Sequence, residues 1–181
     1  ELDGYEADDI IGTLAHQADA AGGFHTYMVT PDKDFCQLVT PTTSIWRPGR
    51  KGTDHEILDV AAVLAQWEVQ RTTQVIDILG LWGDASDNIP GVPGIGPKTA
   101  ADLLQRFGDL ETVLASVDQI SGAKRKENLT NHAEDARISK QLATIQRDVP
   151  VDVDPRAELE QVPDRTKLRE VFRQFELRAP L

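Results

Sequence analysis

Residues 83–104 read GDASDNIPGVPGIGPKTAADLL, and the rest of the chain is organised around this stretch. Its turn carries three glycines: Gly91, Gly94 and Gly96. Because glycine lacks a Cβ atom, the backbone N–H groups of this turn can approach a phosphate closely, and a positive φ costs little there. Pro97 suits the first position of a helix, and Lys98 follows in its first turn. The unpaired N–H groups and the positive dipole end of such a helix suit an anion.

The alternative interpretation of this stretch is a Gly/Pro-rich connection between two helices. Apolar residues at helical spacing follow the glycines, and they are Ala100, Leu103, Leu104 and Phe107. This spacing indicates that a helix begins where the glycines end. A helix start normally prefers acids, so Lys98 is better explained by an external phosphate than by capping. We therefore expect a phosphate-binding hairpin.

The whole chain of 181 residues is long enough for one core, with or without a small appended lobe. It has no apolar run near the roughly 20 residues that span a bilayer, so we expect no membrane partner. The single cysteine, Cys36, excludes an internal disulfide and a cysteine-rich zinc site, which agrees with a reducing cytoplasm. The chain opens without Met in what reads as a helix start, so we expect a piece of a longer protein.

The net charge of −11 argues by itself against a nucleic-acid binder. Seven of the acids, however, fall in three tight clusters that divalent cations could neutralise: Glu6, Asp8, Asp9, Asp32, Asp34, Asp84 and Asp87. Between residues 122 and 147, six basic residues exceed three acidic ones, and three of the basic residues are consecutive: Lys124, Arg125 and Lys126. These three lie where a long polar helix should begin, and basic residues there do not help the helix dipole. Their position therefore favours a role in binding an external anion over the alternative, a basic helix face that only contacts solvent.

The first two acid clusters lie at the ends of expected elements. Glu6, Asp8 and Asp9 fall in the first turn of an amphipathic helix that ends at Gly22. Acids at a helix start can simply satisfy its dipole, but three crowded carboxylates repel one another, which favours a metal site. Asp32 and Asp34 follow an expected buried strand over residues 24–30, at the sheet edge where ligands gather in open α/β folds. An ordinary Asp-rich turn is the alternative here.

The remaining pattern predicts short helices and strands around one core. Helices are expected over residues 35–39, 60–67, 72–81, 110–115, 124–144 and 167–175, and strands over 44–47, 55–58 and 149–153, the last at a sheet edge. Leu79, Leu81 and Trp82 are expected in the core. The tract 47–52 reads as an exposed loop whose three positive charges contact either DNA or solvent.

The chemistry that suits three acid clusters is phosphodiester hydrolysis. Two divalent cations roughly 4 Å apart can activate a water and relieve charge on the leaving oxygen. Hard Mg²⁺ prefers oxygen ligands, which carboxylates supply. The four histidines are scattered without the spacing of zinc ligands.

Three motifs resemble the flap-endonuclease family, and most of all the 5′ nuclease domains of bacterial DNA polymerase I. Residues 4–9 read GYEADD, residues 30–38 read TPDKDFCQL, and residues 83–96 read GDASDNIPGVPGIG. The resemblance implies that five acids are catalytic, namely Glu6, Asp8, Asp32, Asp34 and Asp87. It implies that these, with Asp9 and Asp84, hold two Mg²⁺ or Mn²⁺ ions.

The same resemblance implies how nucleic acid is bound. The hairpin would hold a K⁺ through backbone carbonyls and grip a duplex by its phosphates, with contacts at Gly91, Gly94, Ile95, Gly96, Lys98 and Thr99, and from the basic helix at Lys124, Arg125 and Lys126. The implied partners are double-stranded DNA with a 5′ flap or nick, RNA primer ends and a linked polymerase domain, for a monomer in the bacterial cytoplasm. The family's first strand, with its metal-binding Asp, and its helical arch have no counterpart before Glu1. We therefore expect this chain to hold only part of the active site, which can leave it inactive on its own, and to expose a free sheet edge.

The expected fold class is α/β: a partial PIN-like, Rossmann-like three-layer α/β/α core with a helix–three-turn–helix lobe. We expect two domains: residues 1–82 form the C-terminal part of the nuclease core with its acidic metal site, and residues 83–181 form the helix–three-turn–helix DNA-binding region and the C-terminal helices. Two other functions stay open. A non-catalytic DNA-binding module would use only the hairpin and the basic helix, but it has no reason to keep seven carboxylates beside a phosphate-binding turn. A PIN-like RNA nuclease would share the acids but would not explain residues 91–98.

Overall fold

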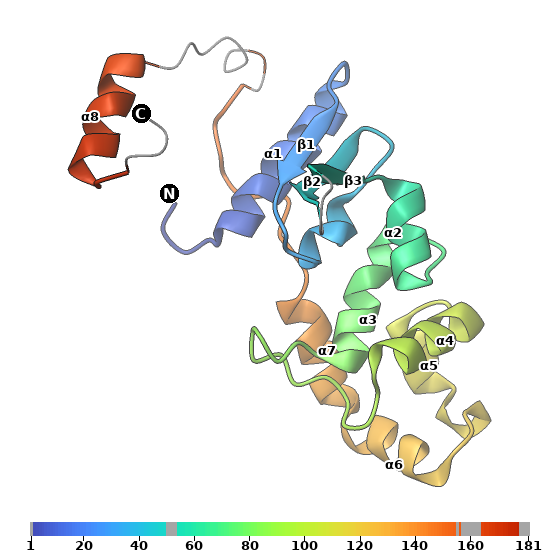
Figure 1. Ribbon diagram of the computed structural model, residues 1–181. Coiled ribbons are helices and arrows are strands. Elements are labelled where there is room, and N and C mark those ends of the chain that lie inside the picture. The colour runs from blue at the N-terminus through green and yellow to red at the C-terminus, as the bar shows by residue number, and fades with distance from the viewer. Residues whose placement is uncertain (1, 50–53, 155, 157–163, 178–181) are drawn as a thin grey trace. The chain divides into compact units, whose positions relative to one another are not determined.

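The computed structural model describes residues 2–49, 54–154, 156 and 164–177 (Figure 1). The chain divides into two compact units, Glu1–Val151 and Asp152–Leu181. The first unit holds the sheet, all three stretches that carry the acids, and the hairpin. In the described ranges, no helix is long and apolar enough to cross a bilayer.

The sheet has three strands in the order β1-β2-β3: β1 (Thr26–Val29), β2 (Thr43–Pro48) and β3 (His55–Leu58). β1 and β2 are parallel, with Thr26 opposite Thr43, and β3 runs antiparallel to β2. Helix α1 (Ala7–Ala21) packs against β1 (Figure 1). These elements confirm the predicted first helix and the three strands around residues 26, 44 and 55.

The prediction that the first strand is buried is wrong for one of its faces. Met28 is 3% exposed, whereas Tyr27 and Val29 are 50% and 72% exposed. Successive side chains of a strand point to opposite faces, and β1 lies at an edge of the described sheet with only one face covered. Hydrophobic residues on both faces suggested burial on both, but the chain covers only the Met28 face.

Short helices connect the sheet to the helical part. They are η1 (Asp34–Leu38), α2 (Val60–Trp67), η2 (Thr72–Gln74) and α3 (Val75–Trp82). The bounds of α2 match the prediction, and η1 and α3 follow it closely. Leu79 and Leu81 are fully buried as expected, but Trp82 is 37% exposed, so its assignment to the core is wrong. Trp82 is the last residue of α3, where the chain turns away at Gly83 and leaves the ring at the surface.

The helical part follows the hairpin. It consists of α4 (Pro97–Phe107), α5 (Leu110–Ala115), η3 (Val117–Gln119), α6 (Ala123–Asn131) and α7 (Ala133–Leu142). Helix α3 packs between α4 and α7 (Figure 1), and Ile78, Leu104 and Leu129 are buried in one continuous core with the sheet residues. The start of α4 at Pro97 and the bounds of α5 confirm the predictions.

The long helix predicted over residues 124–144 is wrong because the chain leaves helical geometry at His132, with φ −115° and ψ 23°. The backbone of His132 closes both pieces, since its N–H donates to the Asn128 carbonyl and its carbonyl accepts from Ala136. Its ring Nδ1 lies 2.7 Å from Asp135. Neither Gly nor Pro marks this break, so the hydrophobic spacing alone gave one helix.

The strand predicted over residues 149–153 is also wrong, since this segment forms no strand in the structure. The Val149 N–H, which a sheet partner would need, donates instead to the hydroxyl of Thr13 at 3.1 Å. In the second unit, the predicted last helix is confirmed as α8 (Arg165–Gln174), which the Asp164 carboxylate caps. Of the basic loop, Arg47 pairs with Glu56 in the sheet, and residues 50–52 lie outside the described part.

Candidate metal centre and nucleic-acid interface

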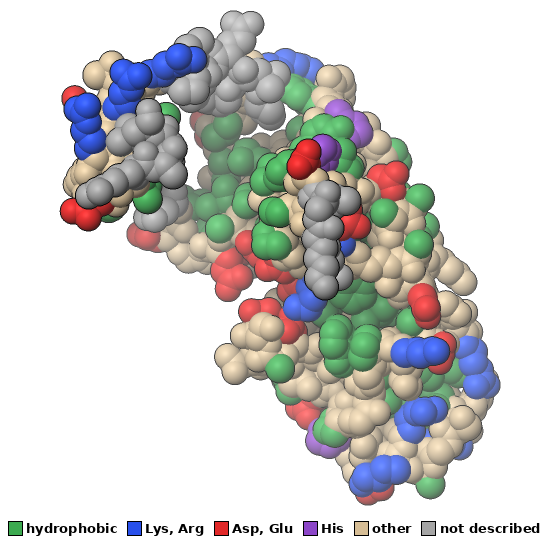
Figure 2. All heavy atoms as spheres, in the orientation of Figure 1, with side chains coloured by type: hydrophobic (Ala, Val, Ile, Leu, Met, Phe, Trp, Pro, Cys, Tyr) green, Lys and Arg blue, Asp and Glu red, His purple; other side chains and the backbone are tan. Residues whose placement is uncertain are grey.

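The second and third acid clusters come together. Carboxylate oxygens of Asp34, Asp84 and Asp87 all lie within 4.8 Å of one another, although 50 residues separate the first two. Asp34 begins η1 directly after β1, and Asp84 and Asp87 lie in the turn after α3. In the space-filling view, carboxylate side chains gather where the sheet part and the helical part of the first unit meet (Figure 2).

The first cluster faces the other two. Burial raises the pKa of Asp8, and so do the negative charges of Asp32, Glu6, Asp9 and Asp87. Asp8 lies in the first turn of α1, and Glu6 is the residue before the helix. The structure therefore brings members of all three predicted clusters within electrostatic reach of one another.

Asp34 is the most strongly perturbed of these acids. Its pKa is raised to about 6, mainly by burial and also by the neighbouring Asp32 and Asp84 charges, while Lys33 opposes the shift. Its Oδ1 atom is buried without a hydrogen-bond partner, 3.8 Å from the Lys33 ammonium. A buried carboxylate oxygen that accepts no hydrogen bond is costly, and a cation would satisfy it.

Lys33 is a functional candidate that the sequence reasoning passed over. Its ammonium forms an ion pair with Asp84. Burial opposes ionisation of Asp84, but the hydrogen bonds from Lys33 and from the Ser86 N–H hold the pKa of Asp84 below its usual value. The signal in the sequence was a lysine between two acids, which could equally have pointed to solvent.

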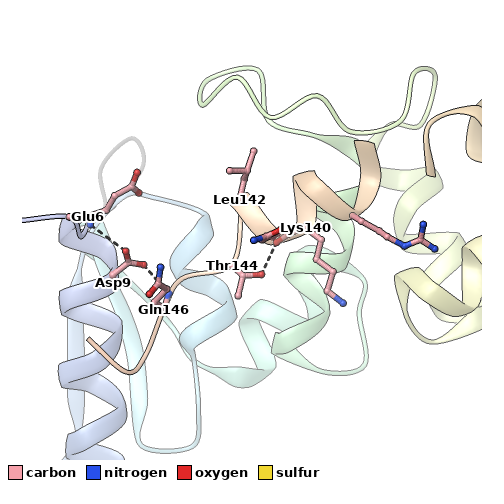
Figure 3. Close-up of a pocket in the computed structure, with 9 residues that line it drawn as sticks. Glu6, Asp9, Lys140, Leu142, Thr144 and Gln146 are labelled. Carbon is pink, nitrogen blue, oxygen red and sulfur yellow. Dashed lines mark hydrogen bonds between the residues drawn. The ribbon is translucent and has the colours of Figure 1, made fainter. Parts of the chain in front are cut away.

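Asp9 differs from the other acids because both of its oxygens accept backbone hydrogen bonds. Oδ2 accepts from the Glu6 N–H at 3.3 Å and Oδ1 from the Gln146 N–H at 2.9 Å (Figure 3). These residues line a hollow of about 690 Å³ between the start of α1 and the end of α7. Asp9 therefore holds the helix start in place, and its role as a metal ligand stays a prediction.

The turn that carries Asp84 and Asp87 is fixed to the hairpin by backbone bonds. Asp84 and Ile89 exchange two hydrogen bonds, of 2.9 and 2.8 Å. Gly91 has a φ of 61°, and a Cβ there would lie 2.3 Å from the Gly83 nitrogen. The Gly91 N–H donates to the buried Ser139 hydroxyl of α7 at 2.9 Å. Only glycine at residue 91 allows this close approach.

The start of α4 is open to an anion. Gly96 is the capping residue and Pro97 follows it, with no side-chain cap and no acid in the first turn. A Cβ on Gly96 would meet no other atom within 4 Å, and Lys98 is exposed. Of the predicted contacts, Ile95 is 4% exposed and its N–H donates to the Val92 carbonyl at 3.1 Å, so its role as a DNA contact stays a prediction.

The basic residues of α6 lie beside this hairpin. The Asn128 amide donates to the Pro93 carbonyl at 2.6 Å, which joins α6 to the turn. Of the predicted contacts, Lys124 pairs with Glu127, while Arg125 and Lys126 bond the carbonyls of Ser121 and Asp118. Asn128 carries no signal in the sequence that could have singled it out.

Two family models cover most of the chain. Residues 1–68 match the 5′-3′ exonuclease N-terminal resolvase-like domain, and residues 70–166 match the 5′-3′ exonuclease C-terminal SAM fold. The chain belongs to the 5′-3′ exonuclease family. The boundary between these matches lies near residue 69, and the predicted division at residues 82 and 83 stays a prediction.

Curated relatives that are similar in sequence support the same family membership. The chain is 45% identical over 175 residues to DNA polymerase I of Bacillus caldotenax, covering 97% of this chain and 20% of that protein. It is 46% identical over 153 residues to DNA polymerase I of Bacillus subtilis, covering 84% and 17%. The chain thus spans about one fifth of the length of these relatives.

Solved structures agree on the fold. A T5 5′-exonuclease with bound divalent zinc ions superposes with a TM-score of 0.68 at 23% identity, over 78% of this chain and 51% of that one. The catalytic core of Rad2 in complex with DNA substrate gives a TM-score of 0.51 at 16% identity, over 93% and 55%. These likenesses confirm the predicted class, an α/β nuclease core with a helical lobe.

Proposed function

We propose that this chain is a metal-dependent 5′ nuclease domain, which acts as a 5′-3′ exonuclease and 5′-flap endonuclease on DNA and on RNA primers. The observation that carries the proposal is the convergence of Asp34, Asp84 and Asp87 within 4.8 Å, directly beside a glycine hairpin. Membership of the 5′-3′ exonuclease family supports it. A pure binding module would gain nothing from carboxylates that repel DNA there.

The donors in the site fit two Mg²⁺ or Mn²⁺ ions. All are carboxylates, and the unbonded buried oxygen of Asp34 needs a cation. The proposed ligands are Glu6, Asp8, Asp9, Asp32, Asp34, Asp84 and Asp87, and all except Asp9 and Asp84 are proposed as catalytic. When bound, such ions lower the pKa of a water and relieve charge on the leaving oxygen. Lys33 then neutralises part of the remaining negative charge beside Asp84.

The hairpin is proposed to hold the duplex. The N–H groups of Gly94, Gly96 and Lys98 at the start of α4 would bind one phosphate, with Thr99 beside them. Gly91 shapes the turn, and the basic residues of α6 extend the surface to further phosphates. A K⁺ held by hairpin carbonyls would strengthen this contact, and the open space over Gly96 leaves room for it.

The proposed substrates are double-stranded DNA with a 5′ flap or a nick, and RNA primer ends, during replication and repair. The names of the relatives and the fifth of their length that this chain covers support a covalently linked polymerase domain. We further propose action as a monomer in the bacterial cytoplasm. Both cleavage modes would use one site, because the hairpin fixes the duplex at the same distance from the acids in either case.

The test is cleavage of a labelled 5′-flap duplex in Mg²⁺ or Mn²⁺, with Asp87→Asn and a chelator as controls. We expect cleavage that both controls abolish. Salt-sensitive duplex binding without any cleavage would overturn the proposal in favour of a non-catalytic DNA-binding module. Cleavage that survives Asp87→Asn would remove this acid cluster from the mechanism.

A further inference from the structure

Gln37 is a buried residue next to the acid cluster, and both its amide nitrogen and its amide oxygen make hydrogen bonds. It lies in η1, three residues after Asp34, and is 2% exposed. Its Nε2 donates to the Asp34 carbonyl at 2.9 Å and to the Ala143 carbonyl at 2.8 Å. Its Oε1 accepts from the Ile145 N–H at 3.0 Å. One side chain thus joins the backbone of an acid to a segment more than 100 residues away.

That distant segment is Ala143–Val149, which follows α7 and which we name the exit segment. Besides Gln37, it bonds the start of α1, where the Gln146 N–H donates to Asp9 (Figure 3). The Arg147 guanidinium donates a hydrogen bond of 3.0 Å to the Gln37 backbone carbonyl. The exit segment therefore contacts both of the acid-bearing elements on the sheet side of the site.

The exit segment is itself firmly held. Helix α7, which precedes it, is anchored by Lys140, whose ammonium lies 2.6 Å from the buried Asp77 carboxylate of α3. In the same helix, Ser139 accepts the Gly91 N–H of the hairpin. Gln37 consequently bonds Asp34 to a rigid support and not to a loose loop.

We propose that Gln37 is a positioning residue, which sets the place of the Asp34 carboxylate for metal binding. The inference rests on the proposed function. The Oδ1 atom of Asp34 accepts no hydrogen bond and lies 3.8 Å from the Lys33 ammonium, whereas the Asp34 backbone is fixed by hydrogen bonds at its N–H and its carbonyl. The backbone carbonyl of Asp34 is what Gln37 holds. Partners that orient metal ligands in this way commonly change metal affinity when they are removed.

A second buried glutamine supplies a matched control. Gln74 is 1% exposed and also makes three backbone hydrogen bonds. Its Nε2 donates to the Gly108 carbonyl at 2.6 Å, and its Oε1 accepts from Gln70 and Arg71 at 2.8 and 3.0 Å. These bonds join η2 to the end of α4, and none of them involves an acid of the site. Loss of either amide should therefore cost similar stability, and only one should change metal affinity.

The experiment compares Gln37→Met and Gln74→Met with the unchanged chain. Mn²⁺ binding is measured by calorimetry at a temperature where circular dichroism shows each protein folded. We expect both variants to melt at lower temperature, and only Gln37→Met to bind Mn²⁺ about tenfold more weakly. In flap cleavage, its kcat should fall while KM for the duplex stays within about twofold, because the hairpin is unchanged.

Three outcomes would contradict the inference. Equal Mn²⁺ affinity in all three proteins would make Gln37 a purely structural amide. Equal weakening in both variants would assign the effect to general loss of stability. No Mn²⁺ binding by the unchanged chain would overturn the proposed metal site and this inference with it. If Gln37→Met does not fold, Gln37→Asn retains the amide one methylene shorter, and it should weaken Mn²⁺ binding in the same direction.

Discussion

The acid cluster and the hairpin are neighbours in the chain, but they are stabilised in opposite ways. Two backbone hydrogen bonds between Asp84 and Ile89 close the hairpin, and the Gly91 N–H joins it to the Ser139 hydroxyl of α7. The acid cluster instead crowds like charges, and Asp34 has a buried oxygen without a hydrogen bond. The hairpin thus contributes stability in the absence of any ligand, whereas the buried carboxylate of Asp34 costs stability until a cation binds.

In the first unit, cleavage and folding stability therefore depend on different residues. Changes at Asp34 should reduce cleavage and leave the fold as stable or more stable. Changes in the closed part of the hairpin should reduce stability first. The first three predictions below test that separation, and the fourth tests the open end of the hairpin, from the largest expected effect to the smallest.

The largest effect is expected from Asp34→Asn on catalysis. The amide keeps the size of the side chain but removes a negative oxygen from the site. We expect the cleavage rate of a 5′-flap duplex to fall about a thousandfold, since metal ions supply several kcal/mol of charge stabilisation. Single-turnover cleavage in Mg²⁺ measures it. A rate within tenfold of the unchanged chain would place the metal site elsewhere.

The next effect is expected from Gly91→Ala on stability. Residue 91 has a positive φ, and its new Cβ would meet the Gly83 nitrogen at 2.3 Å. We expect the free energy of unfolding to fall by about 3 kcal/mol or more. Urea denaturation measures it, with Gly96→Ala as the control, because that residue has a φ of −96° and open space around it. Similar losses in the two variants would show that the closure at Gly91 is not special.

The hairpin was predictable from sequence because its determinants are local. Three glycines and Pro97 fix the turn and the helix start, and the structure begins α4 at Pro97. The bounds of α2, α5 and β3 followed from apolar spacing for the same reason. The motifs also sufficed for the family and the fold class.

For the acid site, the sequence predicted which residues take part but not how they come together. That Asp34 meets Asp84 depends on how α3 packs beside η1, and residues far apart in sequence give no spacing signal for such a meeting. The ion pair of Lys33, the break at His132 and the exposure of Trp82 likewise follow from tertiary packing. Local propensity cannot report them, because each depends on what another segment covers.

A smaller effect, of opposite sign, is expected from Asp34→Asn on stability without metal. The folded pKa of about 6 lies above the ordinary value of 3.8, so the folded state binds more protons between these values. This group's contribution therefore becomes destabilising as pH rises through that window. We expect Asp34→Asn to raise the free energy of unfolding by about 1 to 3 kcal/mol above the window, and the gain to vanish below it. Urea denaturation in chelator at several pH values measures it, and a variant less stable than the unchanged chain at neutral pH would refute it.

The smallest effect is expected from Lys98→Ala on duplex binding. Lys98 is exposed in the first turn of α4, beside an uncapped helix start, so its loss should remove one phosphate contact and leave the fold intact. We expect affinity to fall about threefold to tenfold, and the slope of log affinity against log salt to decrease by about one. Fluorescence anisotropy with a flap duplex in chelator measures both quantities. Lys167→Ala is the matched control, because Lys167 is an exposed lysine on α8 of the second unit and is not among the proposed DNA contacts. Equal losses in both variants would mean that Lys98 acts through net charge alone, and the open helix start would then have no part in gripping DNA.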